Sequence, residues 1–232
     1  ARLDADWRYA KARELVFYLL SRGRATKEQL GLALYPDVSV AQLRARLHRV
    51  LHYARRALAN NDWILFENDE YAFNRARSYW FDVEQFEQRL AAARAAQAGL
   101  PPDMALAIRL LQDAVQLYTG DFLPDLDAEW VLFRREELRR QVLEALLTLG
   151  ALLAGQARLA EAIAVYQRLL ELDSYLEVAH RELMRCYARQ GDAGQARRHF
   201  EQLSLLLRDE LGSEPSPETM RLDEQIREGK AV

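Results

Sequence analysis

Cysteine, glycine and proline are scarce in this chain of 232 residues, and no long apolar run occurs in it. The single cysteine, Cys186, excludes an internal disulfide and favours a reducing cytoplasm. With only 10 Gly and 6 Pro, few positions force a helix to end, which favours a helical fold. Apolar segments stay well below the ~20 residues that cross a bilayer, and the first residues lack the apolar core of a signal peptide. We therefore expect a cytoplasmic chain with no membrane partner.

Charge is divided unevenly between the two ends of the chain. Residues 1–78 hold 14 Lys and Arg against 9 Asp and Glu, a net charge of +5. Residues 79–232 hold 18 against 26, a net charge of −8. A basic segment joined to an acidic one suggests that the first part binds a polyanion and the second part does not.

The first 75 residues predict three helices followed by a β-hairpin. Thr26 and Gln29 fit a capping box at the start of the second helix, and Ser39 is expected to cap the third. Aromatic and branched residues on both sides of the acidic turn Glu67–Glu70 predict the hairpin. This order is the plan of a winged helix-turn-helix, a DNA-binding fold. Apolar periodicity places the three helices at Trp7–Arg22, Lys27–Leu34 and Val40–Ala59.

Beyond Tyr79 the pattern is almost wholly helical, and it contains an internal repeat. Ala162 and Ala196 are 34 residues apart, and so are Tyr166 and Phe200. A small residue followed by an aromatic residue four positions later is typical of the second helix of a tetratricopeptide repeat. We therefore predict a mainly α chain with two domains: a winged helix over residues 1–78 and TPR-like helical hairpins over residues 79–232.

The third predicted helix carries the strongest functional signal. No acid occurs between Asp37 and Asp62, and the side of the helix opposite its apolar stripe is rich in Arg and His. The planar guanidinium of Arg binds a phosphate or a guanine edge with two hydrogen bonds, and the major groove of DNA admits one helix. Lys27, with the free amides at the start of the second helix, is expected to hold a phosphate. The candidate DNA-binding residues are Lys27, Arg44, Arg46, His48, Arg49, His52, Arg55, Arg56, Arg75 and Arg77.

The proposed wing raises an objection, because its tip is acidic and repels phosphates. Either the tip points away from DNA, or the basic residues at the exit of the hairpin, Arg75 and Arg77, contact the DNA backbone together with Asn74. Both possibilities stay open at the level of the sequence.

Catalytic, metal and cofactor sites are not expected. His48 and His52 are four residues apart, but no third ligand accompanies them. His180 and His199 have no acid or nucleophile at a telling spacing, and Cys186 is expected to be a buried apolar thiol. No glycine-rich phosphate loop occurs. An enzyme is therefore the weakest hypothesis for this chain.

Several motifs resemble those of known bacterial regulators. Residues Lys11–Leu15, Arg24–Leu30 and Leu43–Leu47 resemble the OmpR/PhoB-type winged helix. The rest of the chain resembles a bacterial transcriptional activator domain, through motifs at Phe81–Phe86, Tyr118–Pro124, Ala179–Met184 and Asp209–Thr219. Together they cover nearly the whole chain and are similar to the SARP family of regulators.

This resemblance implies a transcriptional activator that binds direct repeats near promoters, often as a dimer, and helps to recruit RNA polymerase. It implies that the third helix reads double-stranded DNA, with Arg44, Arg46, Arg49 and Arg56 at the duplex and Lys27 on a phosphate. The sequence departs from the family at Tyr53 and Ala54, where the family usually has Arg and Leu. The β-strands that precede the first helix in this fold are absent, so we expect a fragment or a trimmed variant.

Two other functions stay open. In one, the helical repeats form a protein-interaction module and the winged helix does not bind DNA, because stacked helix pairs build surfaces that bind peptides. In the other, the repeat domain senses a small ligand, although the sequence carries no pocket signature.

Overall fold

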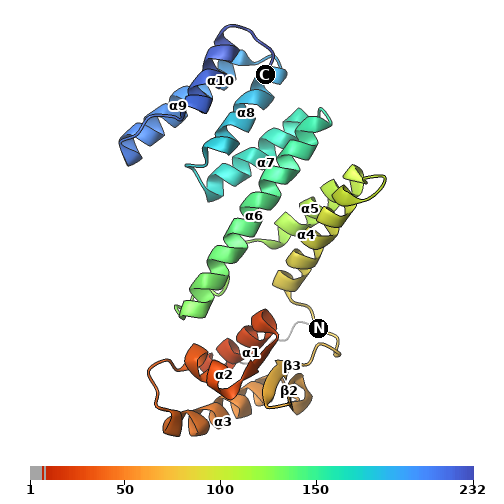
Figure 1. Cartoon of the computed structure of the whole chain (residues 1–232), viewed down its shortest axis with the longest axis vertical. Coiled ribbons are helices and arrows are strands. Elements are labelled where there is room, and N and C mark those ends of the chain that lie inside the picture. Colours follow the sequence, from red (N-terminus) through yellow and green to blue (C-terminus); the bar gives the residue numbers. More distant parts are fainter. Residues whose placement is uncertain (1–6, 8) are drawn as a thin grey trace. The chain divides into compact units, whose positions relative to one another are not determined.

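Figure 1 shows a computed structural model of the chain, which describes residue 7 and residues 9–232. The side chains of residues 40 and 41 are not described, and the expected absence of N-terminal β-strands falls on residues 1–6 and 8, outside the described part. The chain forms two compact units, and each is presented by itself. The first contains Ala1–Phe81 and Phe122–Arg135, and the second contains Asp82–Asp121 and Glu136–Val232.

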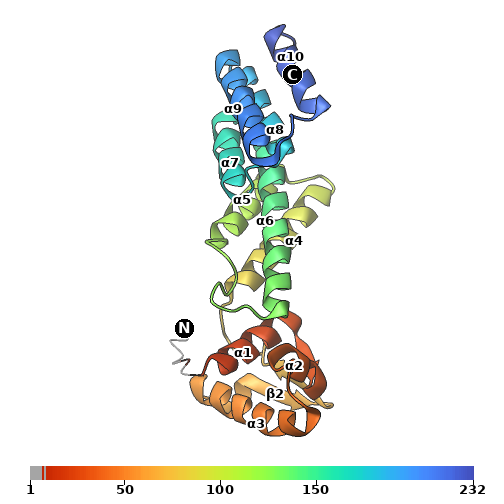
Figure 2. The ribbon, with the colours of Figure 1, turned by 90° about the vertical axis from the view of Figure 1, so that its left-hand side faces the viewer.

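The first unit has the elements of a winged helix. Its small antiparallel sheet has the strand order β1-β3-β2, with Ala25 opposite Tyr71 and Phe66 also opposite Tyr71. Figure 2 shows α1, α2 and α3 grouped with this sheet. In chain order the elements are α1 (Ala10–Arg22), β1 (Arg24–Thr26), α2 (Lys27–Leu34), α3 (Val40–Ala57), the short 3-10 helix η1 (Asn61–Trp63), β2 (Ile64–Glu67) and β3 (Glu70–Phe73).

Local sequence signals explain most of these bounds. The predicted capping box is confirmed, since the Thr26 side chain accepts from the Gln29 amide and the Gln29 side chain accepts from the Thr26 amide. Gly23 ends α1 with a φ of 86°, a conformation that favours glycine. The first helix begins at Ala10 rather than at Trp7, and the third ends at Ala57 rather than at Ala59. Ser39 occupies the N-cap position of α3, as expected, but its side chain makes no cap hydrogen bond.

The core of the first unit also includes a segment that is distant in sequence. The buried carboxylate of Glu14, on α1, pairs with Lys11 at 2.8 Å and accepts a hydrogen bond from the Trp130 indole at 3.3 Å. The Trp130 ring packs edge-on against Tyr18, with centroids 5.2 Å apart. Because Phe17 contacts Phe122 in the same way, residues 122–135 belong to the core of the winged helix.

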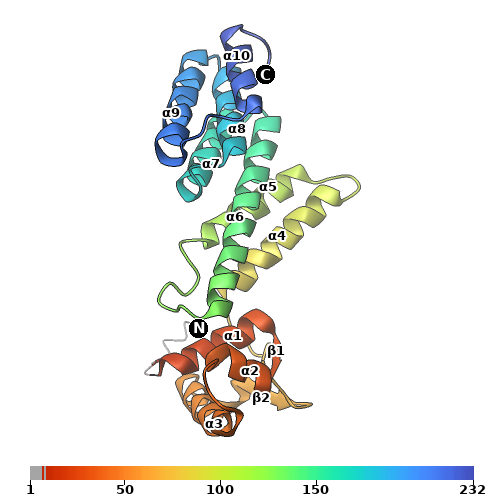
Figure 3. The same ribbon diagram turned by 60° about the vertical axis from the view of Figure 1, so that its left-hand side comes forward.

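The second unit consists of helices. Figure 3 shows α4 and α5 as a pair, and it shows α7 to α9 packed side by side with α10. None of the helices in the described part of the chain is both long and apolar enough to span a membrane. The helices are α4 (Asp82–Ala98), α5 (Met104–Leu117), α6 (Glu129–Gly155, in this unit from Glu136), α7 (Leu159–Leu172), α8 (Glu177–Arg189), α9 (Ala193–Leu211) and α10 (Pro217–Arg227).

The predicted repeat corresponds to a repeated packing arrangement. Ala162 and Ala196 are both completely buried at equivalent places in α7 and α9. Gly150 in α6 lies directly against the ring of Tyr166 in α7, so closely that a Cβ at residue 150 would be 2.5 Å from the ring. One repeat later, Phe200 packs against a buried cluster that contains Met184 and Ala196. Helical hairpins of the tetratricopeptide type are thus confirmed in this unit.

A polar cluster fixes the last helix to the repeats. The carboxylate of Glu177, at the start of α8, accepts hydrogen bonds from the Ser216 amide at 2.9 Å and from the Thr219 hydroxyl at 2.6 Å. Burial by itself would raise the pKa of Glu177, but the hydrogen bonds from Thr219 and Ser216 outweigh it, and the pKa is lowered. Glu177 therefore caps the N-terminus of α10 as a charged group.

Candidate nucleic-acid interface

Helix α3 is strongly amphipathic, and its two sides lie in different environments. Periodicity predicts an apolar stripe of six residues, of which Leu43 is partly buried and the other five are buried: Leu47, Val50, Leu51, Ala54 and Leu58. At about 100° per residue, the opposite side is centred near residues 45 and 52, and it is exposed. We call the exposed cationic and imidazole side chains the basic face: Arg44, Arg46, His48, Arg49, His52 and Arg56.

Most side chains of the basic face have no protein partner. Within the described residues, no hydrogen bond, ion pair or ring contact involves the side chains of Arg44, His48, Arg49 or Arg56. The His52 ring contacts Tyr53 edge-on, with centroids 5.6 Å apart. Because α3 contains neither Asp nor Glu, the positive charge of this face is not neutralised by the helix itself. The geometry therefore leaves these groups available to an anionic ligand.

Aromatic rings hold two of the predicted cations at the margins of this surface. The Arg46 guanidinium lies over the Tyr35 ring at 5.6 Å, and the Lys27 ammonium lies over the Phe66 ring at 5.0 Å. Burial, followed by the hydrogen bond with Tyr9, raises the pKa of Tyr35, so its ring stays neutral. Such contacts orient a cation without neutralising its charge.

Three other predicted residues already have acceptors in the protein. Arg55 donates to the carbonyl of Ile64 at 3.3 Å, and Arg75 donates to the carbonyl of Leu20 at 2.7 Å. Arg77 pairs with the Asp62 carboxylate at 3.4 Å and lies over the Trp63 ring at 4.9 Å. These arginines fasten the hairpin to the helices around it. Contact between DNA and Arg55, Arg75 or Arg77 therefore stays a prediction.

The start of α2 differs from what the sequence suggested. The Gln29 amide donates to the Thr26 hydroxyl oxygen at 3.3 Å, so it is engaged. The Glu28 carboxylate accepts a hydrogen bond from its own amide and interacts with Thr26, and both effects lower its pKa. The amides of Glu28 and Gln29 are therefore already bonded within the protein, and a phosphate contact by Lys27 stays a prediction.

The tip of the hairpin is acidic in the structure, as it is in the sequence. Asn68 and Asp69 adopt positive φ angles of 51° and 62°, the conformation of a tight hairpin turn. Glu67 and Asp69 are exposed, and Arg24 of β1 lies 3.8 Å from the Glu67 carboxylate. Sequence reasoning missed Arg24 as a cation beside the wing, because the three-residue strand β1 has no periodic signal of its own.

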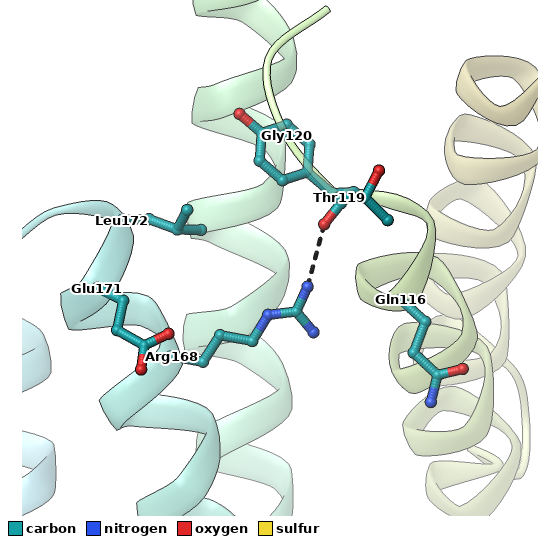
Figure 4. A pocket seen from close by; sticks show the side chains of 7 residues that line it. Gln116, Thr119, Gly120, Arg168, Glu171 and Leu172 are labelled. Atoms are coloured by element: carbon teal, nitrogen blue, oxygen red, sulfur yellow. Dashed lines mark hydrogen bonds between the residues drawn. The ribbon is translucent and has the colours of Figure 1, made fainter.

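The second unit has an open pocket of about 500 Å³, shown in Figure 4. Arg168 reaches from α7 toward the loop that follows α5, and it donates to the carbonyls of Val115 at 2.7 Å and Tyr118 at 3.1 Å. This guanidinium caps the C-terminus of α5, and Glu171 beside it is exposed. The pocket therefore contains both a cation and an anion, and its cation, Arg168, is already hydrogen-bonded to the backbone at the end of α5. The lining residues are Gln116, Tyr118, Thr119, Gly120, Arg168, Glu171 and Leu172.

The remaining titratable side chains that the sequence singled out lie inside the second unit. His180 and His199 join through their ring nitrogens at 2.8 Å, and the other nitrogen of His180 bonds to the Ser174 carbonyl at 2.9 Å. Burial lowers the pKa of both histidines. Cys186 is buried, which raises the pKa of its thiol. His180 and Cys186 are therefore core residues, as expected for Cys186, and His199 is partly buried.

Comparisons with known proteins agree with this architecture. Over 96% of its length, the chain is similar to the structure of Mycobacterium tuberculosis EmbR in complex with a low affinity phosphopeptide, with a TM-score of 0.76 and 21% sequence identity. It spans 60% of the EmbR chain, and no curated protein matches it. Residues 81–227 match the family model of the bacterial transcriptional activator domain. Because this match covers more than half of the sequence, the chain belongs to the bacterial transcriptional activator domain family.

Proposed function

We propose that this protein is a SARP-type transcriptional regulator and that it binds double-stranded DNA by placing α3 in the major groove. The observation that carries the proposal is the basic face, which has no acid on its helix and no protein partner for Arg44, His48, Arg49 or Arg56 among the described residues. A solvated cationic surface of this kind gains affinity by displacing the counterions of DNA phosphates. Arg is also suited to the N7 and O6 acceptors of guanine.

The margins of the surface support the same orientation. Arg46 and Lys27 are held over aromatic rings and keep their charge, which suits contacts to phosphates on either side of a groove. We propose that the acidic wing tip points away from the duplex. The second unit would then serve dimerisation on repeated sites or contacts with RNA polymerase, and the complex would activate transcription.

The test compares two double variants that remove the same charge. Arg49→Ala with Arg56→Ala removes two cations from the basic face, whereas Arg94→Ala with Arg109→Ala removes two exposed cations from the second unit. Binding to promoter DNA is measured by gel shift across a salt series. We expect the first pair to lower affinity at least about tenfold and to reduce the log–log salt slope by about 0.9 for each phosphate contact that is lost.

The control pair is expected to bind DNA as the unmodified protein does, and neither pair should shift the melting temperature, since all four side chains are exposed. Equal affinity of the unmodified protein and the Arg49/Arg56 variant would refute the placement of α3 in the groove. Equal losses in both pairs would show that DNA responds only to total charge.

A further inference from the structure

Two histidines lie near the middle of the basic face. His48 and His52 are one turn apart on α3, about 40° around the helix, and both side chains are exposed. The chain has four histidines in all, and the other two are hydrogen-bonded to each other in the second unit. Histidine is the side chain whose charge changes between about pH 5 and pH 8, so the charge of the basic face is not fixed.

Every charged neighbour of this pair on α3 is a cation. Arg44 lies one turn before His48, and Arg56 lies one turn after His52. Arg49 and Arg55 complete the surroundings on the same helix. Both imidazoles therefore lie among four guanidiniums on the same helix.

The elements packed against α3 offer these two imidazoles no carboxylate that lacks a partner. They are α1, α2 and η1, and their carboxylates are already engaged: Glu14 with Lys11, Asp62 with Arg77, and Glu28 with Thr26. Across the described part of the chain, no ion pair joins either imidazole to a carboxylate. Asp37, in the loop between α2 and α3, is exposed and lies eleven positions before His48. The other charged or titratable groups of these elements, of α3 and of their flanks are Tyr9, Arg13, Tyr18, Arg22, Lys27, Tyr35, Arg46 and Tyr53.

We propose that His48 and His52 bind DNA as imidazolium cations, so that docking of α3 takes up protons from solution. This inference rests on the proposed function. A duplex brings hydrogen-bond acceptors to this surface, namely phosphate oxygens and the N7 and O6 atoms of guanine. An imidazolium offers two N–H donors to such acceptors, whereas a neutral imidazole offers one donor and one lone pair that an acceptor repels. Two protons therefore act as further ligands of the complex.

The consequence is a DNA affinity that rises as the solution becomes more acidic. If the charged form of an imidazole binds DNA about tenfold more tightly than the neutral form, affinity increases roughly sixfold per histidine between about pH 8 and about pH 6. Two such histidines give roughly 40-fold. Arginine, which keeps its charge over this range, contributes nothing to the slope.

The experiment measures binding of the full chain to a fluorescent random-sequence duplex of about 30 base pairs, by anisotropy at constant ionic strength from about pH 6 to about pH 8. His48→Gln with His52→Gln should bind with little dependence on pH. His48→Arg with His52→Arg should bind at about pH 8 as tightly as the unmodified protein binds at about pH 6. His199→Gln is the matched control, because it removes a histidine far from α3 in sequence, and it should keep the full dependence. Circular dichroism at both ends of the range confirms that each variant is folded.

The outcomes separate this inference from the function on which it rests. A protein that binds DNA with the same affinity across the range, or a Gln/Gln variant that keeps the full dependence, would overturn the inference and leave DNA binding intact. No binding to any duplex at any pH would overturn both. A second duplex, selected from the random pool by the chain, distinguishes the acceptors: an equal response on both duplexes indicates phosphates, and a larger response on the selected duplex indicates base edges. Either result supports the inference.

Discussion

Replacing Gly150 by alanine tests the close packing on which the repeat hairpins depend. A Cβ at this position would lie 2.5 Å from Cε1 and Cζ of Tyr166 and 3.0 Å from Cδ1. Carbon atoms in ordinary contact are about 3.5–4 Å apart, so the ring or the helix must move by about 1 Å. The Tyr166 side chain is completely buried, and it therefore has no open space into which it can rotate.

The size of the effect follows from two opposing contributions. Alanine is a better helix former than glycine by about 1 kcal/mol, which favours the variant. Overpacking a rigid core costs about 1–3 kcal/mol, and a contact of 2.5 Å with a buried ring lies at the upper end. We therefore expect Gly150→Ala to lower the free energy of unfolding by about 2 kcal/mol.

Urea denaturation followed by circular dichroism measures this difference, and the same helix offers a matched control. At Gly155, the last residue of α6, a Cβ would have no atom of another part of the protein within 4 Å, so Gly155→Ala should leave stability unchanged or raise it. Combining Gly150→Ala with Tyr166→Ala should remove the cost of the added methyl group, because the ring that it strikes is gone. If Gly150→Ala proves as stable as Gly155→Ala, the described packing of α6 on α7 is wrong.

Three further predictions concern polar groups of the second unit. The buried Tyr166 hydroxyl has no hydrogen-bond partner among the described residues, so Tyr166→Phe should raise the urea midpoint, with a gain of about 1 kcal/mol. Burial, and then the charge of His180, lowers the pKa of His199 from 6.5 to about 4. The unfolded chain therefore binds that proton first, and stability should fall between about pH 6.5 and pH 4 by at most about 3 kcal/mol, a loss that thermal melts should show and that His199→Gln should reduce. Glu177→Ala leaves the buried Thr219 hydroxyl without its carboxylate, and thermal melts should show a loss of about 2–3 kcal/mol.

Much of the helical architecture could be predicted from the sequence because its signals are local. The bounds of α2 agree with the prediction at both ends, since a capping box precedes Lys27 and Tyr35–Pro36 follows Leu34. The 34-residue spacing also identified Ala162 and Tyr166 as packing positions. The capping box and the pair Ala162–Tyr166 each lie within about one helical turn, and the recurrence of that pair 34 residues later can be read directly from the sequence.

The elements that the sequence did not reveal depend on distant partners. Strand β1 exists because Arg24–Thr26 pairs with β3, more than forty residues later in the chain. Likewise, residues 122–135 join the first unit through the hydrogen bond between Trp130 and the buried Glu14, 116 positions apart. Neither contact leaves a periodic trace in the sequence, because a three-residue strand is too short and a single buried acid looks like any exposed one.

For the basic face too, the sequence predicts the features that depend on local periodicity and misses those that depend on contacts with distant residues. Periodicity places Arg49 and Arg56 on the side of α3 opposite its apolar stripe and Arg55 at the flank of that side, but it does not say which of the three already has a partner in the protein. The structure separates them, because Arg55 bonds to the Ile64 carbonyl whereas Arg49 and Arg56 have no partner within the described residues. An arginine that is already bonded loses that bond when it turns to a ligand, so its net contribution to binding is smaller.

The cations differ in how firmly the protein holds them, and this difference predicts which of them contribute to affinity for any DNA and which to selectivity for one sequence. Arg46 and Lys27 are oriented by aromatic rings before any ligand arrives, so a phosphate contact made by them loses little side-chain entropy. Arg49 and Arg56 are unrestrained, so they lose side-chain entropy when they become ordered on DNA. A single phosphate contact offsets this loss poorly, whereas a bidentate contact with guanine offsets it well. On the proposed interface, the margins would therefore set the position of α3 on any duplex, and the side chains without partners would choose the sequence. Replacing Arg46 should then weaken binding to all duplexes alike, whereas replacing Arg49 should reduce the preference for the selected duplex over the random one.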